Sequence, residues 1–293
     1  MYDFSALYEA TSVSHAVELL RDHPNATLIA GGSDVLIKMR EGKLAGAELV
    51  SIYKLDELRE VTMDPDGALR IGPMTSFSHA TNSPLLQQYM PVLGEAADTA
   101  GGPQLRSIGT LGGNICNGVT SADTASTQVA YDAMLEITSA SGMRKLSIHD
   151  FYKGPGKVDL QPGELLTAIL IPKESYENCF GVYIKYAMRN AMDIATIGCS
   201  VNVVLSADKK TIERARIAYG VAGPVPMRAK TAEAALNGQP VSEATIELAG
   251  SQVLDDVNPR TSWRASADFR RQIISETARR GLRAAIERAG GVF

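Results

Sequence analysis

The sequence predicts an α+β fold built from two or three units, and three patterns lead to this prediction. The opening reads as a helix at 11–24 followed by a short apolar strand at 26–32. Residues 132–151 have the pattern of a β-hairpin with a Ser-Gly turn. The C-terminal third reads as several strands followed by helices. A chain of 293 residues is also longer than one small hydrophobic core usually supports.

The first element has the pattern of an amphipathic helix. Its apolar residues recur at helical spacing, namely Val13, Ala16, Val17 and Leu20. Ser12 stands before them as a suitable N-cap, and Pro24 ends the pattern. Strands are expected at 47–53 and 68–72, and helical patterning with a proline break at 84–100.

The segment 100–125 is the most unusual part of the chain. It is rich in glycine, serine, threonine and asparagine, so we expect a loop-rich segment. Apolar residues are spaced through it, which argues for order: Leu105, Ile108, Leu111 and Ile115. A long ordered loop in a compact domain is usually functional.

A strand at 164–172 ends at Pro172, and the polar stretch 173–178 after it is the best candidate for a domain boundary. Beyond it the pattern predicts strands and then two helical stretches, with the strands at 182–188, 194–206 and 212–223. The last helix has one apolar stripe, formed by Ile274, Ala278, Leu282 and Ala285. Its many arginines are expected to form a solvated face.

Composition narrows the class of protein. A formal net charge of −4 argues against nucleic acid as the main partner. No apolar run approaches the roughly 20 residues that span a bilayer, and the first residues lack the pattern of a secretory signal. Cys116, Cys179 and Cys199 lie far apart, which supports neither a metal site nor a disulfide framework. We therefore expect a cytoplasmic protein with reduced thiols and no bound metal.

Two glycine motifs lead to the functional prediction. The first, Gly31-Gly32-Ser33-Asp34, follows an apolar strand, and glycines there allow successive N–H groups to point at one anion. A plain strand-to-helix turn is the alternative interpretation. The second motif, "GTLGGN" at 109–114, repeats the two glycines with Thr110 and Asn114 beside them.

Asp123 follows the second motif. A carboxylate repels phosphate but accepts hydrogen bonds from ribose or ribityl hydroxyls, and capping of the next helical stretch is the alternative role. Together the motifs indicate a ligand with a pyrophosphate and a polyol. The sequence contains no G-x-x-x-x-G-K-[ST], H-E-x-x-H or G-x-S-x-G, which disfavours P-loop NTPases, zinc proteases and serine hydrolases. The scattered histidines are expected to be surface or capping residues: His15, His23, His79 and His149.

Four stretches then match one family in order and spacing. They are "AGGSDVL" (30–36), "GPQLRSIGTLGGNICNG" (102–118), "SAD" (121–123) and "KYAMRNAMDIATIG" (185–198). They resemble the FAD-binding medium subunit of molybdenum hydroxylases. The resemblance covers essentially the whole chain, and within the family it is greatest to the FAD subunit of bacterial xanthine dehydrogenases.

The resemblance implies a fold of the vanillyl-alcohol-oxidase/p-cresol-methylhydroxylase type. Two α+β subdomains would hold FAD, at about 1–55 and 56–175, and a small C-terminal α+β domain at 176–293 would pack an antiparallel sheet with helices. It also implies two partners: a small iron–sulfur subunit with [2Fe–2S] clusters, and a large molybdenum-cofactor subunit that hydroxylates a substrate, by resemblance a purine. Electrons would pass from the clusters through FAD to NAD⁺ or another acceptor.

The resemblance also implies the cofactor contacts, position by position. The first group, expected at the pyrophosphate, is Leu28, Ile29, Ala30, Gly31, Gly32, Ser33 and Asp34. The second, expected at the pyrophosphate and the flavin side, is Thr110, Leu111, Gly112, Gly113 and Asn114. Asp123 would bind a sugar-like hydroxyl, Leu166 and Lys185 would lie beside the isoalloxazine, and Ile194 would lie over the ring.

For the residues near the ring, simpler roles stay open. Lys185 would stabilise the reduced flavin through its charge, or it is an exposed strand lysine. Leu166 and Ile194 are alternatively plain core residues, and Arg106 either contacts a neighbouring subunit or braces its own loop. For the whole chain, the other hypotheses are a stand-alone flavin oxidoreductase of the same fold and a non-catalytic scaffold. No substrate pocket with its own acid–base residues is visible in the sequence, and the intact glycines argue against a scaffold.

Overall fold

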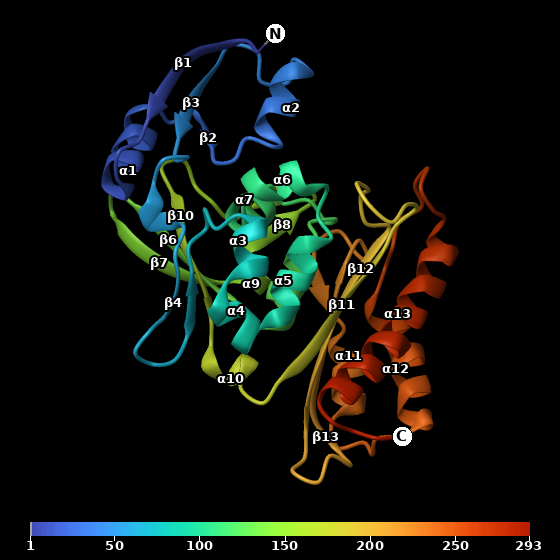
Figure 1. Ribbon diagram of the computed structural model, residues 1–293. Helices are drawn as coiled ribbons and strands as arrows, with labels where there is room; N and C mark the ends of the chain where they lie inside the picture. The colour runs from blue at the N-terminus through green and yellow to red at the C-terminus, as the bar shows by residue number, and fades with distance from the viewer. Residues whose placement is uncertain (1) are drawn as a thin grey trace.

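The computed structural model describes residues 2–293, and its N-terminal lobe is a small parallel sheet flanked by two helices (Figure 1). The strand order is β1-β3-β2. The bounds are Phe4–Glu9 for β1, Thr27–Ile29 for β2, Ala47–Ser51 for β3, Val13–Asp22 for α1 and Val35–Arg40 for α2. The prediction for α1 is confirmed, because Ser12 is its N-cap and accepts a hydrogen bond from the N–H of His15. Strand β1 was not predicted, since its apolar side chains are largely exposed and show no clear alternation.

The second lobe contains a five-stranded antiparallel sheet with the order β4-β5-β10-β6-β7. Its strands are β4 Val61–Met63, β5 Leu69–Ile71, β6 Met134–Ser139, β7 Gly142–Ser147 and β10 Leu165–Ile171. The hairpin predicted at 132–151 is β6–β7, although its last four residues form a helical turn. The shorter elements of this lobe are 3-10 helix η1 Asp56–Leu58, α9 Ile148–Phe151, β8 Tyr152–Gly154 and β9 Lys157–Val158.

Helices share one hydrophobic core with this sheet. They are α3 Phe77–Asn82, α4 Pro84–Tyr89, α5 Pro91–Asp98, α7 Leu111–Cys116 and α8 Ala125–Ala130. Helix α6 Pro103–Ile108 lies against α3 but has no buried residue. The proline break predicted at 84–100 is confirmed, because Pro91 separates α4 from α5.

The prediction of a loop-rich segment at 100–125 was wrong, since α6 and α7 lie within it. Each helix is only six residues long and is bounded by glycine or a cap, so no helical period is visible in the sequence. The prediction of order is confirmed at Leu111 and Ile115, which are fully buried. Leu105 and Ile108, in contrast, are 38% and 39% exposed.

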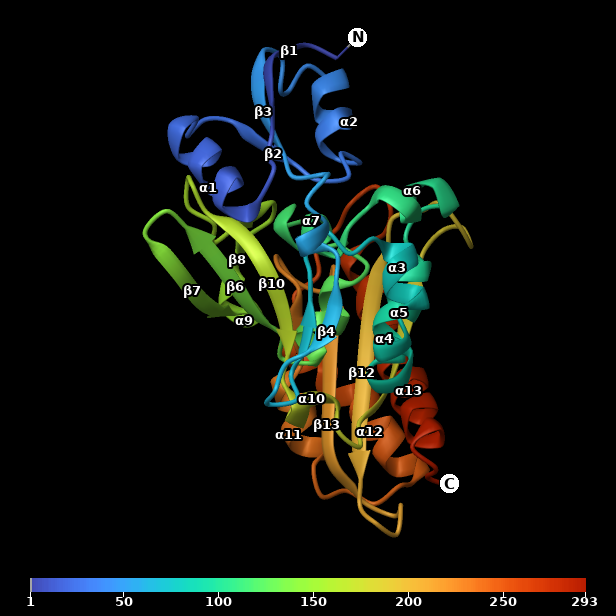
Figure 2. The same ribbon diagram turned by 60° about the vertical axis from the view of Figure 1, so that its left-hand side comes forward.

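The C-terminal lobe places a four-stranded antiparallel sheet, β11-β12-β13-β14, between two layers of helices (Figures 1 and 2). Its elements are β11 Phe180–Tyr186, β12 Ile197–Leu205, β13 Ile212–Gly220, β14 Met227–Arg228, α11 Lys230–Leu236, α12 Glu243–Asp256 and α13 Ala267–Arg288. Helix α13 packs on β11 and β12, while α5 and α8 of the second lobe pack against the same sheet. The sheet therefore joins the second lobe to the C-terminal helices.

Helix α13 confirms its predicted apolar stripe but not a wholly solvated arginine face. The stripe residues are all fully buried: Ile274, Ala278, Leu282 and Ala285. Arg270 is 2% exposed, and its guanidinium donates to the Thr196 carbonyl and to the Ser262 hydroxyl. Arg279 pairs with Glu247 of α12 at 2.8 Å. These arginines attach α13 to its neighbours instead of only facing water. Within residues 2–293, no helix combines the length and the hydrophobicity needed to cross a membrane.

The second and C-terminal lobes are also joined by an ion-pair network around Asp132. Its carboxylate lies 2.6 Å from Arg216 and 2.6 Å from Arg228, both on the C-terminal sheet, and 2.7 Å from His149. Burial raises the pKa of Asp132, but the His149 hydrogen bond and the two arginines outweigh it and hold that pKa below its ordinary value. The stretch expected as a boundary contains one helical turn, α10 Lys173–Tyr176, and a division near residue 175 stays a proposal.

Candidate functional site

The first glycine motif forms the turn between β2 and α2. Gly32 has a φ of +78°, a conformation that glycine adopts without strain. The N–H groups of residues 31–34 have no hydrogen-bond acceptor within residues 2–293. Successive free amides around a left-handed residue form a concave donor site suited to an anion. The turn therefore has the left-handed glycine and the free amides that such a site needs, and pyrophosphate binding by it stays a prediction.

The two glycine motifs lie against each other. A Cβ atom on Gly31 would lie 1.7 Å from the carbonyl oxygen of Ile108, two residues before Thr110. Lys38 of α2 donates to Asn117, just beyond α7, at 2.9 Å. Figures 1 and 2 both place the β2–α2 turn next to α6 and α7. Any side chain at position 31 would push the two loops apart.

The second motif uses its amides within the protein. Thr110 caps α7 and accepts a hydrogen bond from the N–H of Gly113 at 3.0 Å. The N–H groups of residues 111, 112 and 114 donate to nearby backbone carbonyls. The side-chain oxygen of Asn114 accepts from the N–H and the hydroxyl of Thr124, at 3.2 and 2.7 Å. Gly113 remains accessible, and only the Thr110 hydroxyl oxygen lies within 4 Å of where its Cβ would be.

A buried charged group lies where the second lobe meets β11. The Lys185 ammonium is 3.0 Å from the Asp123 carboxylate and donates to the Thr99 carbonyl at 3.0 Å. The Tyr183 hydroxyl donates to the same carboxylate at 3.3 Å. Because the side chains of Lys185 and Asp123 are 7% and 13% exposed, Lys185 is not an exposed strand lysine. Asp123 is not a helix cap either, since Thr124 occupies the N-cap of α8.

Burial dominates the protonation of this group. It raises the pKa of Asp123, although Lys185 and Tyr183 both act to lower it. Burial and the neighbouring Asp123 raise the pKa of Tyr183 well above its ordinary value. Both Asp123 oxygens already accept hydrogen bonds, so binding of a sugar-like hydroxyl would use their remaining lone pairs. That role stays a prediction.

The remaining predicted positions differ in exposure. Leu166 on β10 is 3% exposed and belongs to the core of the second lobe. Ile194 is 48% exposed, in the connection between β11 and β12, so it is not a core residue. Arg106 pairs with Asp98 at 3.1 Å and donates to the carbonyls of residues 100 and 101. It therefore braces its own loop.

The sequence did not indicate several residues of this region. Ile108 supplies the peptide that the first loop touches, and Thr99 and Tyr183 bind the charged pair. Lys38 and Asn117 tie the two loops together. Each of these contacts joins segments far apart in the chain, and none carries a local sequence pattern. Only a match to a known structure gives a signal for them.

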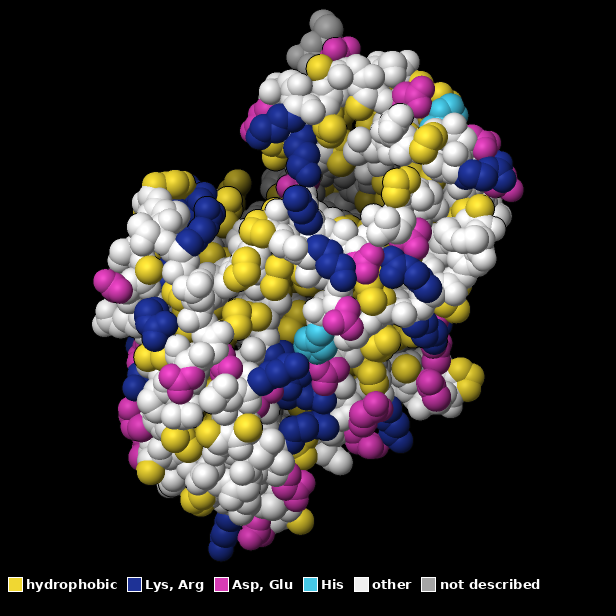
Figure 3. Space-filling model, turned by 180° about the vertical axis from the view of Figure 1, so that it is seen from behind, with side chains coloured by type: hydrophobic (Ala, Val, Ile, Leu, Met, Phe, Trp, Pro, Cys, Tyr) yellow, Lys and Arg dark blue, Asp and Glu magenta, His cyan; other side chains and the backbone are white. Residues whose placement is uncertain are grey.

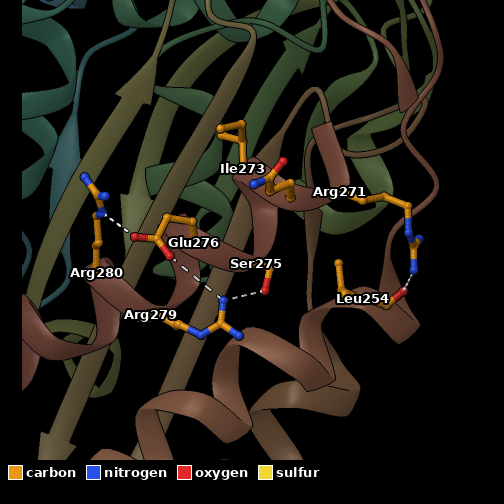
Figure 4. Close-up of a pocket in the computed structure, with 8 residues that line it drawn as sticks. Leu254, Arg271, Ile273, Ser275, Glu276, Arg279 and Arg280 are labelled. Atoms are coloured by element: carbon orange, nitrogen blue, oxygen red, sulfur yellow. Dashed lines mark hydrogen bonds and ion pairs between the residues drawn. The ribbon is translucent and has the colours of Figure 1, made fainter. Parts of the chain in front are cut away.

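Two cavities lie away from the glycine motifs. One, of about 500 Å³, lies beside α12 and α13 and is lined mostly by α13 side chains (Figure 4). Its arginines are already engaged: Arg280 pairs with Glu276 at 2.7 Å, and Arg271 donates to the Leu254 carbonyl at 3.1 Å. The other, of about 670 Å³, is lined by aromatic and charged side chains including Tyr89. Figure 3 also shows a hollow between the N-terminal lobe and the rest of the molecule.

Comparison with known proteins shows the family. Residues 2–174 match the model of the FAD binding domain in molybdopterin dehydrogenase, and residues 182–285 match the CO dehydrogenase flavoprotein C-terminal domain. The chain belongs to this family of FAD-binding subunits. It is accordingly a component of an oxidoreductase complex, and FAD is its cofactor.

Relatives of this FAD-binding subunit cover its whole length. It is 43% identical over 291 residues to the putative xanthine dehydrogenase FAD-binding subunit XdhB of Escherichia coli K12, covering 99% of both chains. It is 28% identical over 275 residues to the carbon monoxide dehydrogenase medium chain of Hydrogenophaga pseudoflava, covering 94% of both. A solved structure of carbon monoxide dehydrogenase from that organism has a TM-score of 0.92 at 28% identity, covering 98% of this chain and 99% of that one. The predicted α+β FAD-binding fold is therefore confirmed.

FAD fits the residues that the structure brings together. The free amides of residues 31–34 match the distributed charge of a pyrophosphate. Gly113 of the second motif is exposed, and only the Thr110 hydroxyl oxygen lies within 4 Å of where its Cβ would be. The first motif thus supplies hydrogen-bond donors, and the second presents an accessible glycine without a side chain.

Proposed function

We propose that this FAD-binding subunit carries electrons within a xanthine dehydrogenase-like complex. It receives them from the [2Fe–2S] clusters of a small partner subunit and delivers them to NAD⁺ or another acceptor. A large partner subunit with the molybdenum cofactor hydroxylates the substrate, a purine. The 43% identity to a xanthine dehydrogenase FAD-binding subunit supports the purine assignment over those of the more distant relatives. A cytoplasmic location stays a prediction of the sequence.

The proposed binding mode assigns separate tasks to separate residues. The amides of residues 31–34 hold the pyrophosphate, with Leu28, Ile29 and Ala30 leading the strand into that turn. Thr110 to Asn114 form the wall behind it and reach the flavin side through Gly113. When bound, FAD supplies the redox chemistry that converts single electrons into a hydride.

The residues of the flavin side orient the cofactor and set its electrostatics. Lys185 places a positive charge near the isoalloxazine, held in position by Asp123 and the Thr99 carbonyl at 3.0 Å. Ile194 covers one face of the ring from the β11–β12 connection. Leu166 supports it from the core of the second lobe. The protein thus binds and orients, and excludes water with aliphatic side chains.

One observation carries this proposal more than any other: the four free amides of residues 31–34 lie where the first loop meets the second. Buried backbone donors without acceptors are uncommon in folded proteins, and here Gly32 is buried while Gly31 and Ser33 are half-buried, so this run supports a ligand site. A scaffold without cofactor has no need for such a turn.

The experiment compares the purified complex with its Gly32→Val variant. Xanthine is expected to lower the flavin absorbance of the wild-type complex without oxygen, and added NAD⁺ to restore it while NADH forms. Gly32→Val should lose FAD, because valine at a φ of +78° is strained, while xanthine still reduces the iron–sulfur clusters. NADH formation at the wild-type rate without FAD would contradict the proposed electron path.

A further inference from the structure

The most exposed aromatic side chain lies outside the glycine motifs. Trp263, the only tryptophan of the chain, is 78% exposed in the turn before α13. Met188 and Met192, between β11 and β12, are 63% and 68% exposed, and Phe269 at the start of α13 is 40% exposed. Clusters of large exposed apolar side chains mark interaction sites more often than bare surface.

Direct contacts join these two segments into one surface. The rings of Tyr186 and Phe269 meet edge to face, with centroids 5.9 Å apart. Buried Arg270 donates to the Thr196 carbonyl at the end of one segment and to the Ser262 hydroxyl in the other. We call this surface the tip surface; it consists of Met188, Met192, Arg260, Trp263, Arg264 and Phe269. Figure 3 shows hydrophobic and basic side chains together at the top of the C-terminal lobe.

The tip surface is locally positive on a chain with a net charge of −4. The Arg264 guanidinium lies 4.2 Å from the centre of the Trp263 ring. Neither Arg260 nor Arg264 forms an ion pair within residues 2–293, and together with burial they lower the pKa of Arg270. Tryptophan, methionine and arginine are the residues enriched at protein interfaces. Unpaired arginines beside an exposed tryptophan fit an acidic protein surface.

The tip surface lies next to the proposed flavin position. The β11–β12 connection that carries Met192 also carries Ile194, which we place over the flavin. Met192 approaches the turn before α6, since a Cβ on Gly102 would lie 3.5 Å from its side chain. A protein docked on the tip surface is therefore next to the proposed flavin position, where an electron donor must be.

We propose that the tip surface is the docking site for the electron-donating iron–sulfur subunit, which would present an acidic and partly apolar face. The proposal rests on the proposed function, because it takes the existence of that donor from it. Beyond the proposed function, it specifies the docking surface, the anchor residue Trp263 and the negative charge of the partner's face.

The test uses the complete complex, purified through a tag on the FAD-binding subunit, and measures FAD and iron per tagged chain. Trp263→Ala is expected to weaken subunit association about 30-fold, the size typical of an interface anchor, so that iron is lost on dilution while FAD stays. Arg260→Glu should act in the same direction and more strongly at low salt. Both side chains are exposed, so circular dichroism and thermal unfolding should match the wild type.

Arg280→Glu is the matched control: it reverses an exposed charge of α13 outside the tip surface, and the iron content should not change. Wild-type iron content in Trp263→Ala and Arg260→Glu would overturn the docking site and leave the proposed function intact. Loss of FAD in both variants would place the surface in the cofactor site and also overturn it. A wild-type chain that carries FAD and never iron would overturn the proposed function itself, and the docking site with it.

Discussion

The two glycine motifs are similar in sequence and opposite in what their backbones do. Among the described residues 2–293, the four consecutive N–H groups of residues 31–34 have no acceptor, whereas the amides of residues 111–114 all have one. Gly31 is required by the neighbouring loop, and Gly112 by Pro73, whose Cβ would lie 2.4 Å from a Cβ at that position. A Gly-Gly pair alone therefore does not identify a ligand site. The first motif supplies hydrogen-bond donors, and the second belongs to the packed backbone segment against which the first motif lies.

The largest effect is expected from Gly31→Ala, which tests the contact between the motifs. A Cβ 1.7 Å from the Ile108 oxygen forces the loops to separate by more than an ångström, so FAD should be lost almost completely. The ratio of flavin to protein absorbance measures this. Gly42→Ala is the control: it lies at a φ of +77° with nothing near its Cβ, and should cost about 1–2 kcal/mol in strain while FAD stays bound. Full FAD in Gly31→Ala would show that the contact is dispensable.

Next in size is Lys185→Met, which tests the charged group behind the second motif. It leaves Asp123 buried without its cation, at an expected cost of about 3–5 kcal/mol in the free energy of unfolding. Urea unfolding of the FAD-free chain measures the cost, and the double variant Lys185→Met/Asp123→Asn should recover most of it. The flavin midpoint potential should fall in Lys185→Met, because the positive charge is lost while Asp123 remains. It should fall less in the double variant, which loses one charge of each sign. An unchanged potential would contradict the electrostatic role of Lys185.

The elements predicted correctly are those whose structure is decided by residues close together in the sequence. The helix capped by Ser12, the β6–β7 hairpin and the stripe of α13 follow from spacing and turn residues, and all are present. The free amides at 31–34 also follow locally, since glycine permits the turn. Strand β1 was not predicted, and the prediction of a loop-rich segment at 100–125 was wrong, because these elements are short or exposed and show no period.

The sequence does not predict the contacts between residues far apart in the chain. Nothing local indicates that the Gly31 backbone meets Ile108, or that Asp123 faces Lys185 across 62 residues. The burial of Arg270 within an arginine-rich helix is likewise set by Thr196, on another element. Asp123 was predicted as a ligand contact from its place after the second motif, and Lys185 from the family resemblance alone. The structure adds that they bind each other.

A smaller effect is expected from Asn114→Ala, which tests whether the second motif serves the fold. The substitution removes the acceptor for the N–H and the hydroxyl of Thr124 at the start of α8. Within residues 2–293 the N–H then has no acceptor, and the hydroxyl keeps only the hydrogen bond that it accepts from Gln128. We expect the free energy of unfolding to fall by about 1–3 kcal/mol, with the FAD dissociation constant changed much less. Asn114→Asp keeps the acceptor and is the control. A loss of FAD affinity larger than the loss of stability would make Asn114 a cofactor contact first.

The smallest effect is expected from Thr110→Val, which removes one hydrogen bond from the second motif. Without the cap, the N–H of Gly113 is free, and the unfolding free energy should fall by about 1 kcal/mol, the usual value for an N-cap. Thr110→Ser retains the hydroxyl and should be close to wild type. Thr110→Val gives the second motif a free N–H donor like those of the first, so it tests directly the difference between the two motifs. If the FAD affinity is unchanged or higher while the stability falls, the second motif supports the fold and the first motif binds the cofactor. If affinity and stability fall together, the second motif acts through the Thr110 hydroxyl itself.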